Sequence, residues 1–150
     1  MLTFRLEAWP DVVEEMKPLF VRHWEEIGVD RDVVLMDMDY EMYAKYHEIG
    51  YLKITTVRAD GKLVGYCMAL VCTHLHYQST LFGLGDLYYI APEHRKGMAG
   101  IRMFMEHEKN MRGLGVKKLT TITKIFHDIS PMLIKLGWKP QEITLTKVLD

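Results

Sequence analysis

The chain has 150 residues, of which 49% are hydrophobic and 26% charged, so it is long enough for one globular domain with its own core. Its formal net charge of −1 gives no overall basic field for nucleic acid or an anionic membrane, and only a local basic patch stays open. The N-terminus lacks the basic start and apolar run of a signal peptide, and no apolar run reaches the roughly 18 residues of a membrane span. We therefore expect a single domain, residues 1–150, in a reducing cytoplasm, which also suits the two cysteines of one predicted strand, Cys67 and Cys72.

The N-terminal half is predicted to hold a short strand, two helices and a strand hairpin. Apolar residues recur at helical spacing through the first helix, and Gly50 follows the second as its terminator. The dipeptide Asp60-Gly61 is a strong signal for a tight turn between two strands. In chain order these elements cover residues 3–7, 10–27, 39–49, 51–58 and 63–75.

The C-terminal half is predicted to alternate strands with helices. One strand ends at Pro92, a helix runs from Gly97 to about residue 112, and Ser130-Pro131 begins a short helix that Gly137 ends. The strands of this half are expected at residues 81–91, 117–123 and 142–149. An antiparallel meander followed by strands and helices in alternation predicts an α+β fold.

The stretch "LYYIAPEHRKGMAG", residues 87–100, combines a strand, a proline, a basic turn with glycines and a helix start. A helix N-terminus presents unpaired N–H groups and a partial positive charge, and small residues allow an anion to approach the backbone. The stretch therefore indicates a phosphate site. The alternative is an ordinary strand-to-helix turn with exposed basic residues.

The order of elements, with "DLYYIAPEHRKGMAG" (86–100) and "IKLGWKP" (134–140), resembles the GNAT superfamily of acyl-CoA-dependent N-acyltransferases over essentially the whole chain. The sequence around "THLHYQST" and "PEHRKGMAG" is most similar to that of members encoded by bacteriophages. The resemblance implies a three-layer α+β fold, with a mixed, mostly antiparallel central sheet flanked by helices. It also implies acetyl-CoA as co-substrate and an amine acceptor that attacks it directly in a ternary complex.

The resemblance implies that the basic turn cradles the pyrophosphate of coenzyme A. Backbone N–H groups from Arg95 to Gly100 would bind it, and Arg95 and Lys96 would add charge. The turn is one residue shorter than the family spacing or shifted against it, so residues 94–99 or 95–100 match, and we prefer the first. A backbone N–H of Tyr89 or Ile90 would polarise the thioester carbonyl. The cofactor candidates are Tyr89, Ile90, His94, Arg95, Lys96, Gly97, Met98, Ala99 and Gly100.

Removal of a proton from the acceptor amine needs a base, for which Asp86 is the leading candidate. Relatives often carry a Glu one residue earlier, where this chain has Gly85. Asp86 could act as base, bind a cationic amine or make a structural hydrogen bond. His74 and His76 share one strand face and could form a base or water relay. They are also half of a metal site, but no third ligand is evident, so no metal is expected.

The proton donor to the leaving thiolate is missing from its usual place. Relatives place a Tyr five residues before the aromatic residue of the later motif, and counting back from Trp138 gives Leu133. Tyr88, Tyr89 or His127 could substitute, with Tyr88 named as the catalytic candidate. Alternatively, the thiolate leaves without a dedicated acid, because a thiol pKa lies near 8.5.

The sequence does not identify the amine acceptor. Acidic residues in the region 25–43 favour a cationic amine, although a solvated charged loop is the commoner explanation of them. Protein amines and modified nucleobases are further acceptors, with nucleic acid disfavoured by the net charge. A domain that binds acyl-CoA or a partner without turnover is the non-enzymatic alternative. A Rossmann domain does not fit, because the G-x-G-x-x-G motif is absent. The oligomeric state is not set, and a homodimer stays open.

Overall fold

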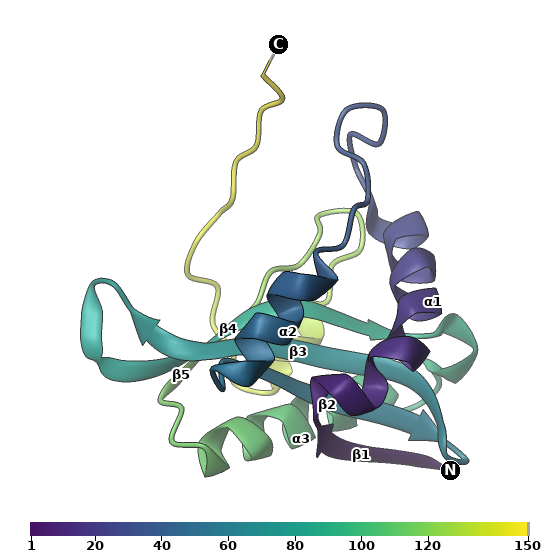
Figure 1. Ribbon diagram of the computed structural model, residues 1–150, viewed down its shortest axis with the longest axis horizontal. Coiled ribbons are helices and arrows are strands. Elements are labelled where there is room, and N and C mark those ends of the chain that lie inside the picture. Colours follow the sequence, from purple (N-terminus) through teal and green to yellow (C-terminus); the bar gives the residue numbers. More distant parts are fainter. Residues whose placement is uncertain (150) are drawn as a thin grey trace.

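Five strands form one sheet in the order β1-β2-β3-β4-β5 in the computed structural model, which describes residues 1–149 (Figure 1). Neighbouring strands from β1 to β4 are antiparallel, and β5 pairs with β4 in parallel. This confirms the predicted α+β fold with a mixed, mostly antiparallel sheet. The strands are β1 Leu2–Glu7, β2 Leu52–Ala59, β3 Lys62–His74, β4 Tyr77–Ile90 and β5 Lys118–Thr120.

Helices cover both faces of this sheet. Helices α1 (Trp9–Ile27) and α2 (Tyr40–Glu48) lie on one face, and α3 (Ala99–Gly113) and α4 (Ser130–Lys135) pack against the other. A single 3₁₀ turn, η1 (Pro92–His94), joins β4 to the loop before α3. None of the helices in residues 1–149 is long and apolar enough to cross a membrane.

The face under α1 and α2 is held by a cluster of aromatic and aliphatic side chains. Val12, Met16 and Phe20 recur every four residues on α1, so they form one buried stripe against the sheet. Asp39 caps the start of α2, because its carboxylate accepts a hydrogen bond of 2.8 Å from the Met42 N–H. These contacts fix the position of α2 over β4.

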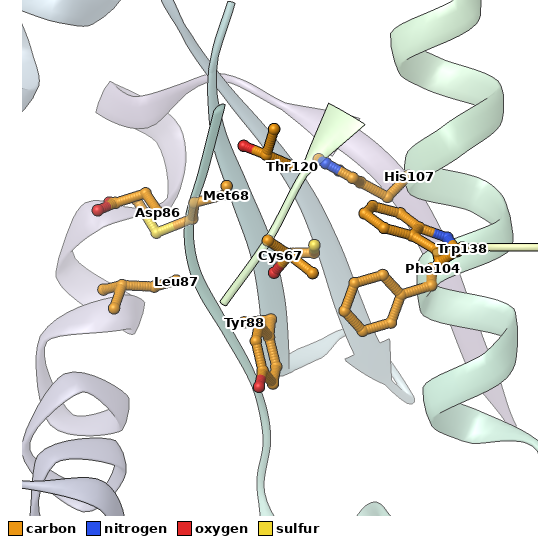
Figure 2. Close-up of a pocket in the computed structure, with 11 residues that line it drawn as sticks. Cys67, Met68, Asp86, Leu87, Tyr88, Phe104, His107, Thr120 and Trp138 are labelled. Atoms are coloured by element: carbon orange, nitrogen blue, oxygen red, sulfur yellow. The ribbon is translucent and has the colours of Figure 1, made fainter. Parts of the chain in front are cut away.

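Strand β4 carries a bulge in its second half. Ala69 of β3 faces Gly85 and Cys67 faces Tyr88, so Met68 alone lies opposite two β4 residues, Asp86 and Leu87. A bulge of this kind turns two successive side chains toward the same side of a sheet. Figure 2 shows Asp86 and Leu87 projecting from the same side of β4.

Strand β5 pairs with β4 over only three residue positions. The ladder joins Phe82–Leu84 to Lys118–Thr120, and beyond it the two strands diverge. Gly85 lies where they separate, and a Cβ atom built there would be 2.4 Å from the Thr120 carbonyl oxygen. The glycine therefore permits the close approach of the strands and excludes the glutamate that the family resemblance leads one to expect there.

Three predicted strands differ from the structure by more than one residue. The strand expected at 117–123 is only Lys118–Thr120, because residues 121–129 leave the sheet and form a separate loop with one bridge between Lys124 and His127. The closing strand expected at 142–149 is absent from the described chain, where this segment is extended and unpaired (Figure 1). Strand β4 begins earlier than expected, at Tyr77, because it pairs with the end of β3.

Candidate active site

A cavity of about 580 Å³ opens where β4 and β5 separate. Its walls come from the end of α1, the second half of β4, the start of α3 and the loop 121–129. This volume lies within the roughly 300–1,000 Å³ that is usual for ligand sites. A much smaller cavity of about 10 Å³ adjoins it between β4, β5 and α3, and the two share Asp86, Leu87, Tyr88 and Phe104 (Figure 2).

Asp86 lines the cavity, on the side of the sheet that carries α2. Its carboxylate accepts a hydrogen bond of 2.5 Å from the Tyr43 hydroxyl, which sequence reasoning did not single out. The surrounding protein atoms raise the pKa of Asp86, and the Tyr43 hydrogen bond partly offsets this rise. Burial and the charge of Asp86 both raise the pKa of Tyr43, so its phenol stays protonated and remains a donor.

The opposite end of the cavity reaches the turn between η1 and α3. Gly97 adopts a left-handed conformation, with φ of 62°, and lines the cavity together with Gly100 and Ile101. No side chain caps the start of α3, so the first N–H groups of the helix are free of side-chain partners. These features fit the expected phosphate cradle.

The other residues of the predicted cradle have different environments. Ala99 is 3% exposed and belongs to the core under α3, so its side chain does not face a ligand. Met98 is exposed at the start of α3, Lys96 is exposed in the turn, and His94 ends η1. Only Arg95, Gly97 and Gly100 of residues 94–100 contribute to the described cavity wall.

Arg95 is held by contacts within the protein. Its two terminal nitrogens donate hydrogen bonds of 2.6 Å to the Glu26 carboxylate, and its Nε donates a 2.6 Å bond to the Ile90 carbonyl. The guanidinium carbon also lies 5.3 Å from the centre of the Tyr89 ring. These bonds lower the pKa of Glu26 and join the turn to the end of α1. His127 approaches the same carboxylate at 3.5 Å.

The backbone direction along β4 distinguishes Tyr89 from Ile90. The Ala91 N–H donates to the Val64 carbonyl of β3, so the Tyr89 N–H, two residues earlier, also points toward β3. Donors alternate along a strand, so the N–H groups of Tyr88 and Ile90 point the other way. That side is the gap left by β5.

The side chains of Tyr88 and Tyr89 lie on opposite faces of the sheet. Tyr88 lines the cavity and packs edge-on against Phe104, and burial raises its pKa. Tyr89 is 4% exposed and stacks on His23 with ring centres 4.9 Å apart. Leu133, which occupies the position of the expected acid, is buried in the core.

The structure does not bring His74 and His76 to Asp86. Both histidines lie at the tip of the β3–β4 hairpin, where His74 pairs with Tyr77 and its Nδ1 accepts a bond from the His76 N–H. Asp86 is nine residues further along β4, about 30 Å of extended strand. The described residues contain no cluster of three or more side chains suited to a metal ion.

Two buried histidines lie beside the cavities instead. His23 Nδ1 is 3.0 Å from the Tyr66 hydroxyl, and His107 Nδ1 is 3.0 Å from the Thr55 hydroxyl. Burial lowers the pKa of each to about 4, so both are neutral near pH 7. Their positions on the apolar stripes of α1 and α3 signalled burial but not proximity to a site.

Several solved acetyltransferase structures share this arrangement of elements. An aminoglycoside acetyltransferase from an uncultured soil metagenomic sample, in complex with sisomicin, aligns with a TM-score of 0.74 and 12% identity over 99% of this chain and 97% of that chain. This chain has the fold of the GNAT acetyltransferases. A predicted acetyltransferase from Clostridium acetobutylicum, with acetyl-CoA, has this fold too, with a TM-score of 0.68, 13% identity and coverage of 99% and 96%.

The acetyltransferase fold extends to enzymes named for different acceptors. A ribosomal-protein-alanine N-acetyltransferase from Brucella melitensis biovar Abortus 2308 aligns with a TM-score of 0.70 and 14% identity, over 100% of this chain and 99% of that chain. Neither a protein-family profile nor a curated protein sequence matches the chain. At these identities the likeness establishes the acetyltransferase fold.

Proposed function

We propose that this protein is an acyl-CoA-dependent N-acyltransferase that moves an acetyl group from acetyl-CoA to an amine while both are bound. The observation that carries the proposal is the gap where β4–β5 pairing stops, next to the bulge at Asp86 and Leu87. The cavity in this gap extends from the start of α3 to Asp86. A cavity of this extent would join the proposed phosphate cradle to a carboxylate, as a long thioester and an amine require.

The residues of the turn are suited to hold the pyrophosphate of the co-substrate. The N–H groups around Gly97 and at the start of α3 would bind its oxygens, and the helix dipole would favour its charge. Both terminal nitrogens of Arg95 donate hydrogen bonds to Glu26, so Arg95 serves chiefly to fix the conformation of the turn. Lys96 is a further exposed cation in the same turn, and Lys124 lines the cavity.

Acetyl-CoA would supply an activated acetyl carbon, to which the amine nitrogen bonds as the carbon–sulfur bond breaks. The N–H groups of Tyr88 and Ile90 would polarise the acetyl carbonyl, because they point into the gap. Asp86 would accept the amine proton directly or through water, and its raised pKa suits that role. Tyr88 is our candidate donor of a proton to the sulfur.

The acceptor is proposed to enter on the side of α1 and α2. Asp86 turns to that side because of the bulge, and Tyr43 of α2 fixes its orientation. A carboxylate there favours a cationic amine over a neutral hydroxyl. The structurally similar enzymes are named for aminoglycosides, a ribosomal-protein alanine and glucosamine 6-phosphate. We therefore propose both small amines and peptide amines as acceptors to be tested.

The proposal is tested with acetyl-CoA, a panel of amines and a colorimetric readout of free thiol. The panel should hold aminoglycosides, amino sugars, polyamines and peptides with free N-termini. We expect amine-dependent thiol release by the unmodified chain and a loss of about 10²–10⁴-fold in Asp86→Asn, the usual cost of losing a general base. Equal rates of thiol release by Asp86→Asn and the unmodified chain with the same amine would show that Asp86 is not the base.

Binding of acyl-CoA without turnover is the second candidate. Two observations favour it. Leu133 is buried at the position where relatives carry the tyrosine that protonates the thiolate, and the Tyr43 hydroxyl already donates a hydrogen bond to the Asp86 carboxylate. Calorimetric titration with CoA separates the two. Micromolar binding of CoA, with no thiol release across the whole panel, would support this second candidate and contradict catalysis.

A further inference from the structure

The gap between β4 and β5 ends in the small cavity of about 10 Å³. Gly85 and Thr120, where the two strands separate, line this cavity. The main cavity runs from Gly97, before α3, to Asp86, where it adjoins the small one. A ligand with its phosphates at the turn before α3 would therefore direct its far end toward the small cavity.

The aromatic walls of the small cavity are held in place by other contacts. The Trp138 indole donates a 2.7 Å hydrogen bond to Glu108 and meets the Phe104 ring edge-on, with ring centres 6.0 Å apart. Phe104 is 1% exposed and also packs edge-on against Tyr88, at 5.5 Å between ring centres. Figure 2 shows Phe104 and Trp138 on the side of α3, opposite Cys67 of β3. Close packing of this kind leaves the walls little freedom to move apart.

The small cavity has room for a single small group. A cavity needs roughly 10–15 Å³ to hold one water molecule, and a methyl group has a similar size. Carbon and sulfur atoms of Cys67, Met68 and Phe104 contribute to the lining. The Nδ1 atom of His107, beside them, already lies 3.0 Å from the Thr55 hydroxyl. This lining favours a methyl group over a water molecule, because a buried water requires several polar partners.

We propose that the small cavity receives the methyl group of the transferred acetyl, and that Phe104 and Trp138 restrict the acyl chain to two carbons. This inference rests on the proposed function and adds to it the class of thioester that the site accepts. Asp86 leaves β4 on the opposite side of the sheet from Phe104 (Figure 2). The amine would approach the carbonyl carbon from the Asp86 side while the methyl group points under α3. A longer acyl chain would need the space that the two aromatic rings fill.

The first test compares the affinities of CoA, acetyl-CoA, propionyl-CoA and butyryl-CoA for the full chain. Calorimetric titration without an amine measures binding apart from turnover. One extra methylene in a closed apolar pocket changes recognition by roughly 10–200-fold. We expect propionyl-CoA to bind at least about tenfold more weakly than acetyl-CoA, and butyryl-CoA to bind more weakly still. Equal affinities for the three thioesters would overturn the proposal.

Substitutions Phe104→Leu and Trp138→Leu should each enlarge the cavity and remove most of the difference between acetyl-CoA and propionyl-CoA. Trp138 is only partly buried, so Trp138→Leu carries the test if Phe104→Leu fails to fold by circular dichroism. The matched control is Phe20→Leu, because Phe20 is 2% exposed in the core under α1 and lines neither cavity. The control should discriminate between the thioesters as the unmodified chain does. Unchanged discrimination in the folded cavity variants, or an equal loss in the control, would contradict the proposal.

These measurements distinguish a failure of this proposal from a failure of the proposed function. Discrimination by chain length in binding, without thiol release from any thioester on the amine panel, would support the cavity and contradict acetyl transfer. Binding of CoA without discrimination among its thioesters would contradict the cavity alone. Absence of binding by CoA and by all three thioesters would overturn both.

Discussion

The Tyr43 hydroxyl donates a 2.5 Å hydrogen bond to the Asp86 carboxylate and so links α2 to the bulge of β4. The Tyr43 ring in turn stacks on Trp9, with ring centres 4.9 Å apart, so the donor is anchored by the core under α1. Asp86 is therefore oriented by a side chain 43 positions away in the sequence. This contact makes the protonation of Asp86 depend on α2.

Substitution Tyr43→Phe should raise the pKa of Asp86. The hydrogen bond lowers that pKa while burial raises it, and the substitution removes only the lowering influence. If Asp86 acts as the base, the acidic limb of the pH–rate profile should move to higher pH in Tyr43→Phe and vanish in Asp86→Asn. Tyr46→Phe, on the same helix, is the control and should leave the limb in place. A limb that stays fixed in Tyr43→Phe would contradict the assignment of Asp86.

Substitution Gly97→Val should weaken the binding of CoA. Gly97 has φ of 62° and Gly61 has φ of 86°, so a valine at either site strains the backbone by about 1–2 kcal/mol. Gly61→Val, in the β2–β3 turn, is therefore a control with matched strain but no contact with the cavity. Calorimetric titration with CoA should show reduced affinity only for Gly97→Val. Equal affinities in the two folded variants would disprove the phosphate cradle.

Substitution Gly85→Ala should destabilise the fold at the end of the β4–β5 ladder. The added Cβ would lie 2.4 Å from the Thr120 carbonyl oxygen, so a strand has to move. Overpacking of this kind costs about 1–3 kcal/mol, and each kcal/mol lowers Tm by about 2–4 °C in a domain of this size. Gly113→Ala, where a Cβ meets nothing within 4 Å, should leave Tm unchanged or slightly higher. An unchanged Tm in Gly85→Ala would show that the strands are not in close contact.

Stability should fall between pH 6.5 and pH 4 because of two buried histidines. Burial lowers the folded-state pKa of His23 and His107 to about 4, so the unfolded chain binds more protons in this window. Their contribution is complete above pH 6.5 and is lost as pH falls through 4, on the order of 3 kcal/mol for each. Urea titrations at pH 7 and 5 would measure the slope. His23→Gln/His107→Gln should flatten it, and an unchanged slope would contradict burial of these groups in the neutral form.

The stretch 87–100 could be interpreted from sequence because its signals are local. A strand that ends at a proline, a glycine with positive φ and a helix start are each set by neighbouring residues. The order of the elements likewise follows from hydrophobic periodicity, and it predicted the fold class correctly. Ala99 was included in the predicted cradle as a small residue, but it packs in the core under α3.

The remaining parts of the site depend on contacts between distant residues. Nothing near Tyr43 indicates that its hydroxyl reaches Asp86, and nothing near Glu26 indicates that it neutralises Arg95. His74 and His76 were linked to Asp86 by their place in adjacent strands, but β3 and β4 are long, and the histidines lie at the far tip of the hairpin. The closing strand predicted at 142–149 is wrong for the described chain, because the alternating pattern carries no information on whether a sheet edge is there to pair with it.

Under the proposed mechanism, the Arg95–Glu26 ion pair links the two substrate sites thermodynamically. Arg95 fixes the turn proposed for the pyrophosphate, and Glu26 lies on the last turn of α1, one helical turn after His23 in the cavity wall. A ligand that shifts the turn must also shift α1, and coupling between two sites is reciprocal. The factor by which CoA changes the affinity for an amine must therefore equal the factor by which that amine changes the affinity for CoA. Substitution Glu26→Gln, which weakens the connection, should bring both factors toward one.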